Sequence, residues 1–187
     1  MRVAGYVASE EDRARVASEL PRLVRETPVA LAVDVLPPPQ CEVVQAIGRL
    51  GAGGLRIETA GGATDLVQGE QMVVRVTGPD TATHVHVAYV MADGQVAHLL
   101  PAPWRSGALA PGQSVTIGDG SEGGPRYTVD APFGKETILV LAAPAPVFAE
   151  PRPDAEPAAA FLAAMRQAAA QGRLQAAGVV LTTRARQ

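Results

Sequence analysis

The sequence is poor in cysteine, lysine, asparagine and aromatic residues. Cys41 is the only cysteine among the 187 residues, so the chain can form neither an intramolecular disulfide nor a cysteine-rich zinc site. Asn is absent, which excludes an N-glycosylation sequon. Aromatic residues make up only 4% of the chain, so its core must be built mainly from Val, Leu and Ala.

Strong charge and long apolar runs are also lacking. The net charge of −3 argues against a nucleic-acid-binding protein, which usually carries a basic patch. No apolar run reaches the length of about 18 residues that a membrane-spanning helix needs. The first residues do not contain the apolar core of a signal peptide. Because a strand pattern begins at residue 2, we expect the chain to be part of a longer protein.

Residues 1–52 are predicted to form a small β-α-β-α module. Strand patterns at residues 2–8 and 28–36 alternate with helical patterns that begin at Ser9 and at Gln40. Ser9 is followed three residues later by an acidic residue, as in a capping box. The order of elements resembles that of a BON domain, a small bacterial module.

Residues 53–187 are predicted to form an antiparallel β-sandwich of about seven or eight strands. Short β-branched runs alternate there with turn sequences such as Asp-Gly, Pro-Gly and Pro-Phe-Gly. After a proline-rich connector, residues 158–171 have the pattern of an Ala-rich helix, and the final residues form a strand that returns to a sheet edge. The predicted fold class is therefore α+β.

Three histidines are the only candidates for a metal site. His84 and His86 alternate along one strand and so share a face. If Asp93-Gly94 is a two-residue hairpin turn, Tyr89 pairs with His98, and His98 faces away from the other two histidines. The sequence therefore predicts no metal site, with His84 and His86 as weak candidate ligands.

No catalytic constellation is evident, and we expect neither a catalytic residue nor a cofactor. The glycine-rich stretch 118–124 lacks the Lys and Ser/Thr of a phosphate-binding loop. None of Ser106, Ser114 and Ser121 lies in a nucleophile elbow. Cys41 falls on an amphipathic helix, where a buried, unreactive thiol is expected.

The loop sequences contain residue types that are typical of partner-binding surfaces. Trp104 and Arg105 follow each other in a proline-flanked loop, and Trp and Arg are enriched at interface hot spots. Phe133 lies in the Pro-Phe-Gly turn. We predict Trp104, Arg105 and Phe133 as binding residues, with a structural role for Trp104 as the alternative.

The sequence YVMADGQVAHLLPAP, followed by LAPGQSVTIGDG and YTVDAPFGKETILVLAAPAPVF, resembles the bacterial family known as domain of unknown function 4384. The resemblance covers residues 66–148. It implies the C-terminal part of a larger bacterial protein, such as a membrane-anchored serine/threonine kinase, a caspase-like peptidase or an envelope protein, in which another domain performs the catalysis. Display in the periplasm would be compatible with that context.

The expected function is that of a non-catalytic sensor or protein-interaction module. A sandwich with exposed loops and edge strands can recruit a protein without titratable clusters. A structural or oligomerisation domain is the first alternative. A metal-dependent hydrolase that uses His84, His86 and an acidic residue is the remote one.

Overall fold

The structure, a computed structural model, describes residues 2–24 and 28–186. The chain forms two compact units, Met1–Glu42 and Val43–Gln187. Within the described ranges, no helix is both long enough and apolar enough to cross a membrane.

The first unit contains a β-α-β motif, which corresponds to the first three elements of the predicted β-α-β-α module. Strands β1 (Arg2–Val7) and β2 (Ala30–Val35) pair in parallel, with helix α1 (Glu10–Leu23) between them in the sequence. The Ser9 hydroxyl accepts a hydrogen bond from the Asp12 backbone amide at 3.1 Å, which caps α1. No residue of α1 is buried, so backbone pairing and capping order this unit more than a core does.

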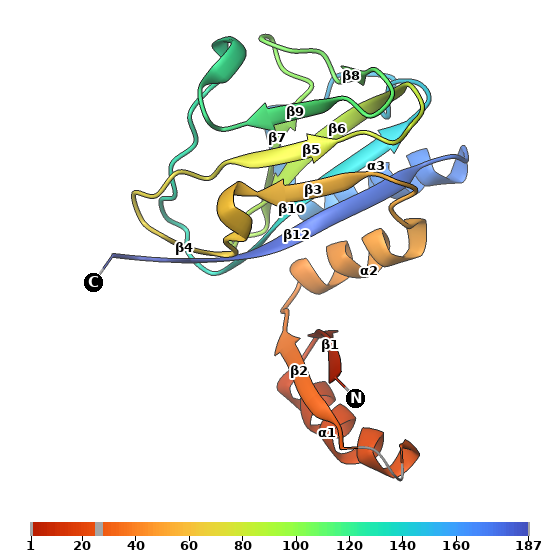
Figure 1. The fold of residues 1–187 in the computed structure, drawn as a ribbon, viewed down its shortest axis with the longest axis vertical. Coiled ribbons are helices and arrows are strands. Elements are labelled where there is room, and N and C mark those ends of the chain that lie inside the picture. Colours follow the sequence, from red (N-terminus) through yellow and green to blue (C-terminus); the bar gives the residue numbers. More distant parts are fainter. Residues whose placement is uncertain (1, 25–27, 187) are drawn as a thin grey trace. The chain divides into compact units, whose positions relative to one another are not determined.

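The second unit consists of a seven-stranded and a three-stranded sheet (Figure 1). The larger sheet has the strand order β11-β7-β6-β10-β12-β4, with β8 paired to β6, and the smaller has the order β3-β5-β9. All pairs except β12–β4 are antiparallel. The strands are β3 (Arg56–Thr59), β4 (Asp65–Val67), β5 (Val74–Thr77), β6 (Thr83–Val90), β7 (Gln95–Leu100), β8 (Ala108–Leu109), β9 (Ser114–Ile117), β10 (Lys135–Ala143), β11 (Ala155–Pro157) and β12 (Gln175–Arg184).

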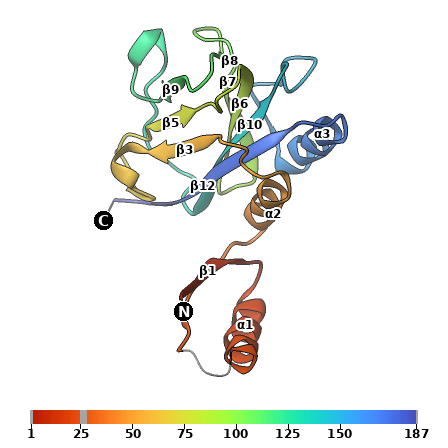
Figure 2. The ribbon, with the colours of Figure 1, turned by 45° about the vertical axis from the view of Figure 1, so that its right-hand side comes forward.

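Two apolar clusters cover the two faces of the larger sheet, because successive strand residues point to opposite sides. On β6, Val85 and Val87 belong to the cluster shared with the smaller sheet, whereas Ala88 and Val90 belong to the cluster shared with helix α3 (Ala158–Ala170). Figure 2 shows α3 on the side of the larger sheet away from β3, β5 and β9. The mixed α+β sandwich predicted from the sequence is confirmed.

The C-terminal strand differs in position from the prediction. β12 lies between β10 and the three-residue β4, so it is not an edge strand. The physical reason is that β10 is buried along almost its whole length and needs a pairing strand on each side.

The two units divide within helix α2 (Gln40–Leu50), earlier than the boundary that the sequence suggests after residue 52. Val43 is fully buried in the cluster under α3, and Ile47 and Leu50 pack against that cluster. The second half of α2 therefore belongs to the sandwich.

Candidate functional site

The β6–β7 hairpin places His86 and His98 on one face of the larger sheet, where the sequence predicts opposite faces. His98 pairs with Ala88, and Tyr89 pairs with Ala97. His98 is thus displaced by one residue from the predicted pairing with Tyr89. A displacement of one residue moves a side chain to the other face of a sheet. The predicted separation of the two histidines is wrong.

The length of the hairpin loop explains this difference. The Met91 N–H donates to the Gln95 carbonyl at 2.8 Å, and the Gly94 N–H donates to the Met91 carbonyl at 3.0 Å. These bonds enclose a loop of three residues rather than two. Gly94 adopts φ +82°, the left-handed conformation that ends such three-residue loops. An Asp-Gly pair suits both loop lengths, so the sequence alone does not distinguish them.

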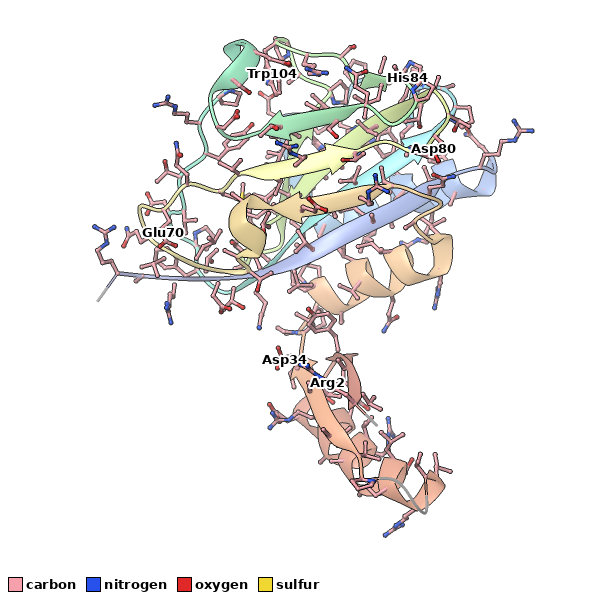
Figure 3. The ribbon with its side chains drawn as sticks, in the orientation of Figure 1. Arg2, Asp34, Glu70, Asp80, His84 and Trp104 are labelled. Carbon is pink, nitrogen blue, oxygen red and sulfur yellow. The ribbon has the colours of Figure 1, made fainter. Side chains whose placement is uncertain are left out.

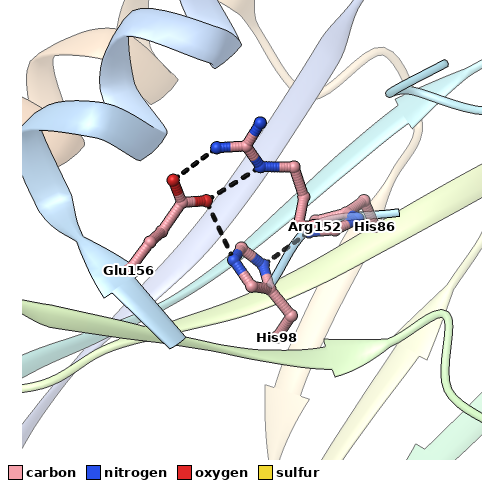
Figure 4. Close-up of polar contacts among 4 residues, drawn as sticks. All are labelled: His86, His98, Arg152 and Glu156. Carbon is pink, nitrogen blue, oxygen red and sulfur yellow. Dashed lines mark hydrogen bonds and ion pairs between the residues drawn. The ribbon is translucent and has the colours of Figure 1, made fainter. Parts of the chain in front are cut away.

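Four polar side chains form a buried chain of hydrogen bonds on this face, which we call the relay (Figure 4). Arg152 Nε donates to Glu156 Oε1 at 2.9 Å, and Arg152 Nη2 is bonded to Glu156 Oε2. His98 Nε2 lies 3.0 Å from the same Glu156 Oε1, and His98 Nδ1 lies 2.9 Å from His86 Nε2. Glu156, His98 and His86 are each about 6% exposed, whereas Arg152 is 25% exposed.

The bonding pattern assigns the tautomers of both histidines. The Glu156 carboxylate, paired with a guanidinium, can only accept hydrogen bonds, so His98 Nε2 carries a proton and donates. In a neutral ring the other nitrogen of His98 is then the acceptor, and His86 Nε2 donates to it. His86 Nδ1 is left with a lone pair. The relay thus ends in a hydrogen-bond acceptor.

Both histidines are uncharged at neutral pH. Burial, together with the neighbouring His98 and Arg152, lowers the pKa of His86 to about 3. Burial also lowers the pKa of His98; Glu156 opposes this effect, and Arg152 adds to it. The positive charge of Arg152 already compensates Glu156, so the carboxylate does not need a charged histidine.

Two phenylalanines enclose the relay. The ring of Phe148 meets the His86 ring edge-on, with centroids 4.8 Å apart, and Phe161 of α3 lies 5.5 Å from the ring centroid of His98. The Arg152 guanidinium stands 5.4 Å from the centre of the Phe148 ring. These contacts hold the loop before β11 against β6 and β7.

A pocket of about 440 Å³ adjoins the relay. Its lining is mostly apolar and comes from the first half of β6, the loop around β8, and the loop before β11. The lining residues are His84, Val85, His86, His98, Pro101, Ser106, Gly107, Ala108, Pro146, Val147, Phe148, Ala149, Glu150, Pro151 and Arg152. His84 Nδ1 is buried there and has no hydrogen-bond partner among the described residues. An orphaned polar atom in a pocket is a group that a ligand or a water can complete.

Trp104 and Arg105, the first two predicted binding residues, make internal contacts. The indole is half-buried and packs against the cluster between the sheets, with Gly124 so close that a Cβ there would lie 3.2 Å from the ring (Figure 3 labels Trp104 and His84). Arg105 forms an ion pair with Glu122. Together these contacts join the loop after β7 to the loop after β9.

Phe133, the third predicted binding residue, is half-buried against the same cluster between the sheets. It does not line the pocket beside the relay. The roles of Trp104, Arg105 and Phe133 in partner binding stay predictions.

The weak metal candidates lie together in the pocket. His84 and His86 both line it, on the face that they share. Within the described ranges, however, no group of three or more His, Cys, Asp or Glu side chains is arranged to hold a metal ion. Glu156, the acidic partner of the histidine pair among the described residues, is already bonded to Arg152.

A second buried carboxylate, Glu136, faces the interior of the sandwich. Its oxygens accept hydrogen bonds from the Tyr89 hydroxyl and, at 3.3 Å, from the Ala92 backbone amide. Burial raises the pKa of Glu136, and these donors only partly offset the effect. Glu136 lines a smaller pocket of about 210 Å³.

Sequence reasoning missed Glu156 and Arg152. They lie in the stretch that reads as a proline-rich connector, and the hydrogen bond between His98 and Glu156 spans 58 positions. The one available signal is the presence of two opposite charges, four residues apart, beside apolar sequence.

Residues 65–146 match the model of a family described as "Domain of unknown function (DUF4384)". The match confirms the resemblance for that stretch of the sandwich, from β4 to the loop after β10. No curated protein is similar enough to be counted as a relative.

Proposed function

We propose that this chain is a non-catalytic protein-interaction module that binds its partner through the pocket beside the relay. The observation that carries the proposal is the combination of a mostly apolar pocket with an orphaned buried nitrogen, His84 Nδ1. Such a pocket suits an apolar anchor residue of a partner with one polar group to orient it.

The charges of the relay support binding over catalysis. Arg152 and Glu156 neutralise each other, and His98 uses both of its ring nitrogens within the relay. The pKa of about 3 for His86 makes its free nitrogen a weak base at neutral pH. The side chains are therefore suited to hold a shape and to offer a hydrogen bond.

A hydrolase is the second candidate, because Ser106 lines the same pocket as His84 and His86. Among the described residues, neither Ser106 nor His84 is hydrogen-bonded to a base or an orienting carboxylate that would complete a nucleophile–base–acid series. This candidate would require His84 to act as the base.

The resemblance of residues 65–146 to the family supports a wider context for the module. We propose that it serves as a sensor or recruitment part of a larger bacterial signalling or envelope protein, such as a membrane-anchored serine/threonine kinase.

Peptide display against the whole chain tests the binding role. We expect enriched peptides to share an apolar anchor residue and to bind at least about tenfold more weakly when Ala149→Trp or Ala108→Trp narrows the pocket. The matched control is Ala160→Trp, at an exposed position of α3 outside the pocket lining. Equal binding by all three variants, or no enrichment at all, would refute the proposed site.

A further inference from the structure

We propose that the anchor this pocket receives is a tyrosine side chain of the partner, and that His86 Nδ1 accepts the hydrogen of its hydroxyl group. The inference rests on the proposed function and names the chemistry of the partner at that same pocket.

The direction of the relay is the first argument. The Glu156 carboxylate requires a proton on His98 Nε2, and the unprotonated His98 Nδ1 in turn requires a proton on His86 Nε2. His86 can therefore present only a lone pair at Nδ1. A ligand group that meets this atom must therefore be a donor. An acceptor such as a carbonyl or a carboxylate would face another lone pair.

The walls of the pocket are the second argument. Phe148, Val147 and three prolines contribute apolar surface, and His86 and Phe148 present rings at a right angle to each other. Aromatic side chains pack well in such edge-to-face surroundings. The occupant is therefore an apolar ring that also carries a donor.

His84 is the third argument, and it separates tyrosine from tryptophan. His84 lines the same pocket from the same face of β6 as His86, and its buried Nδ1 has no hydrogen-bond partner among the described residues. A phenolic hydroxyl can donate one hydrogen bond and accept another, whereas an indole N–H only donates. Tyrosine is thus the side chain that can serve both histidines.

The charged residues around the pocket indicate whether the bound side chain is neutral or charged. Arg152 is bound to Glu156 on the side of the relay, and Glu150 is exposed at the rim. With both relay histidines neutral, no described residue that lines the pocket carries an uncompensated positive charge that would attract an anion. A neutral phenol fits this balance better than a phosphorylated tyrosine.

The tautomers can be measured without any ligand. In a long-range proton–nitrogen NMR spectrum of the full chain, we expect both His86 and His98 to be protonated at Nε2 and unprotonated at Nδ1. A His86 ring protonated at Nδ1, or a charged His98 at pH 7, would overturn the inference while leaving the pocket as a binding site.

The ligand class is tested with two matched peptides, acetyl-Ala-Tyr-Ala-amide and the same peptide with O-methyltyrosine. We expect the tyrosine peptide to shift the His86 Nδ1 resonance and to bind roughly tenfold more tightly, since only it can donate. Equal affinity of the two peptides, or binding of neither, would overturn the inference. In the latter case the anchors found by peptide display would show whether the proposed binding role survives.

A variant gives an independent check. His86→Gln keeps a donor for His98 but removes the acceptor at Nδ1, so we expect the preference for tyrosine over O-methyltyrosine to disappear. His84→Gln should reduce that preference less. A preference that persists in His86→Gln would contradict the assigned contact, and the wild-type peptide comparison decides the matter if the variant does not fold.

Discussion

Glu156 and Glu136 are two carboxylates on opposite faces of one sheet, and they are buried in different ways. Both are almost inaccessible, at 6% and 2% exposure. Glu156 faces a guanidinium and a histidine, whereas Glu136 faces the Tyr89 hydroxyl and a backbone amide. The first is compensated by a full charge and the second only by dipoles. Burial alone does not determine the cost of a charge; the partner does.

The largest expected effect comes from removing the charge of Glu156. Glu156→Gln leaves the partly buried Arg152 without a counter-charge and turns an amide N–H toward its guanidinium. We expect a loss of about 3 kcal/mol in the free energy of unfolding, measured by urea denaturation at pH 7. The matched control is Glu136→Gln, for which we expect a change within about 1 kcal/mol because no cation depends on it. Similar losses of unfolding free energy in the two variants would contradict the proposed difference between Glu156 and Glu136.

The second prediction concerns how the free energy of unfolding depends on pH through His86, a member of the relay. The pKa of His86 is about 3 in the folded chain and lies near 6.5 when the chain is unfolded, so between these values only the unfolded chain takes up the proton. Stability is therefore lost as the pH falls through this window. Between pH 7 and pH 5 we expect His86→Gln to lose about 2 kcal/mol less than the wild type. Urea denaturation of both proteins at the two pH values measures this difference. An equal loss of unfolding free energy in the wild type and in His86→Gln would refute the prediction.

The smallest effect, of opposite sign, is expected at Glu136. Because burial raises the pKa of this carboxyl group, the folded chain holds its proton to a higher pH than the unfolded chain does. The stabilising contribution is complete at low pH and is lost as the pH rises through the raised pKa. Glu136→Gln should remove this decline, which thermal unfolding between pH 4 and pH 7 would detect. A steeper decline in the variant would mean that the pKa of Glu136 is lowered instead.

Much of the fold could be predicted from local pattern. Residues 9–12 indicate the start of α1, and the structure has the expected cap. The Ala-rich stretch from Ala158 forms α3, with Phe161 and Met165 buried as its apolar stripe predicts. These features depend on interactions between residues close in sequence, where periodicity and capping chemistry are informative.

The candidate site could not be predicted, for two physical reasons. The face that His98 occupies depends on whether the hairpin loop holds two residues or three, and Asp93-Gly94 permits both. The partners Arg152 and Glu156 come from a connector whose path over the sheet is set by Phe148 and Phe161, far from the hairpin in sequence. Neither fact has a local signature.

The single cysteine by itself excluded a disulfide framework and a cysteine-rich zinc site, and the turn sequences indicated an antiparallel sandwich. Only the tertiary structure decided that His86 and His98 meet and that a distant ion pair fixes their protons. Strand formation follows from the alternation of side chains along the chain. The sheet face that a side chain occupies and the residue that pairs with a buried charge depend instead on strand register and long-range packing.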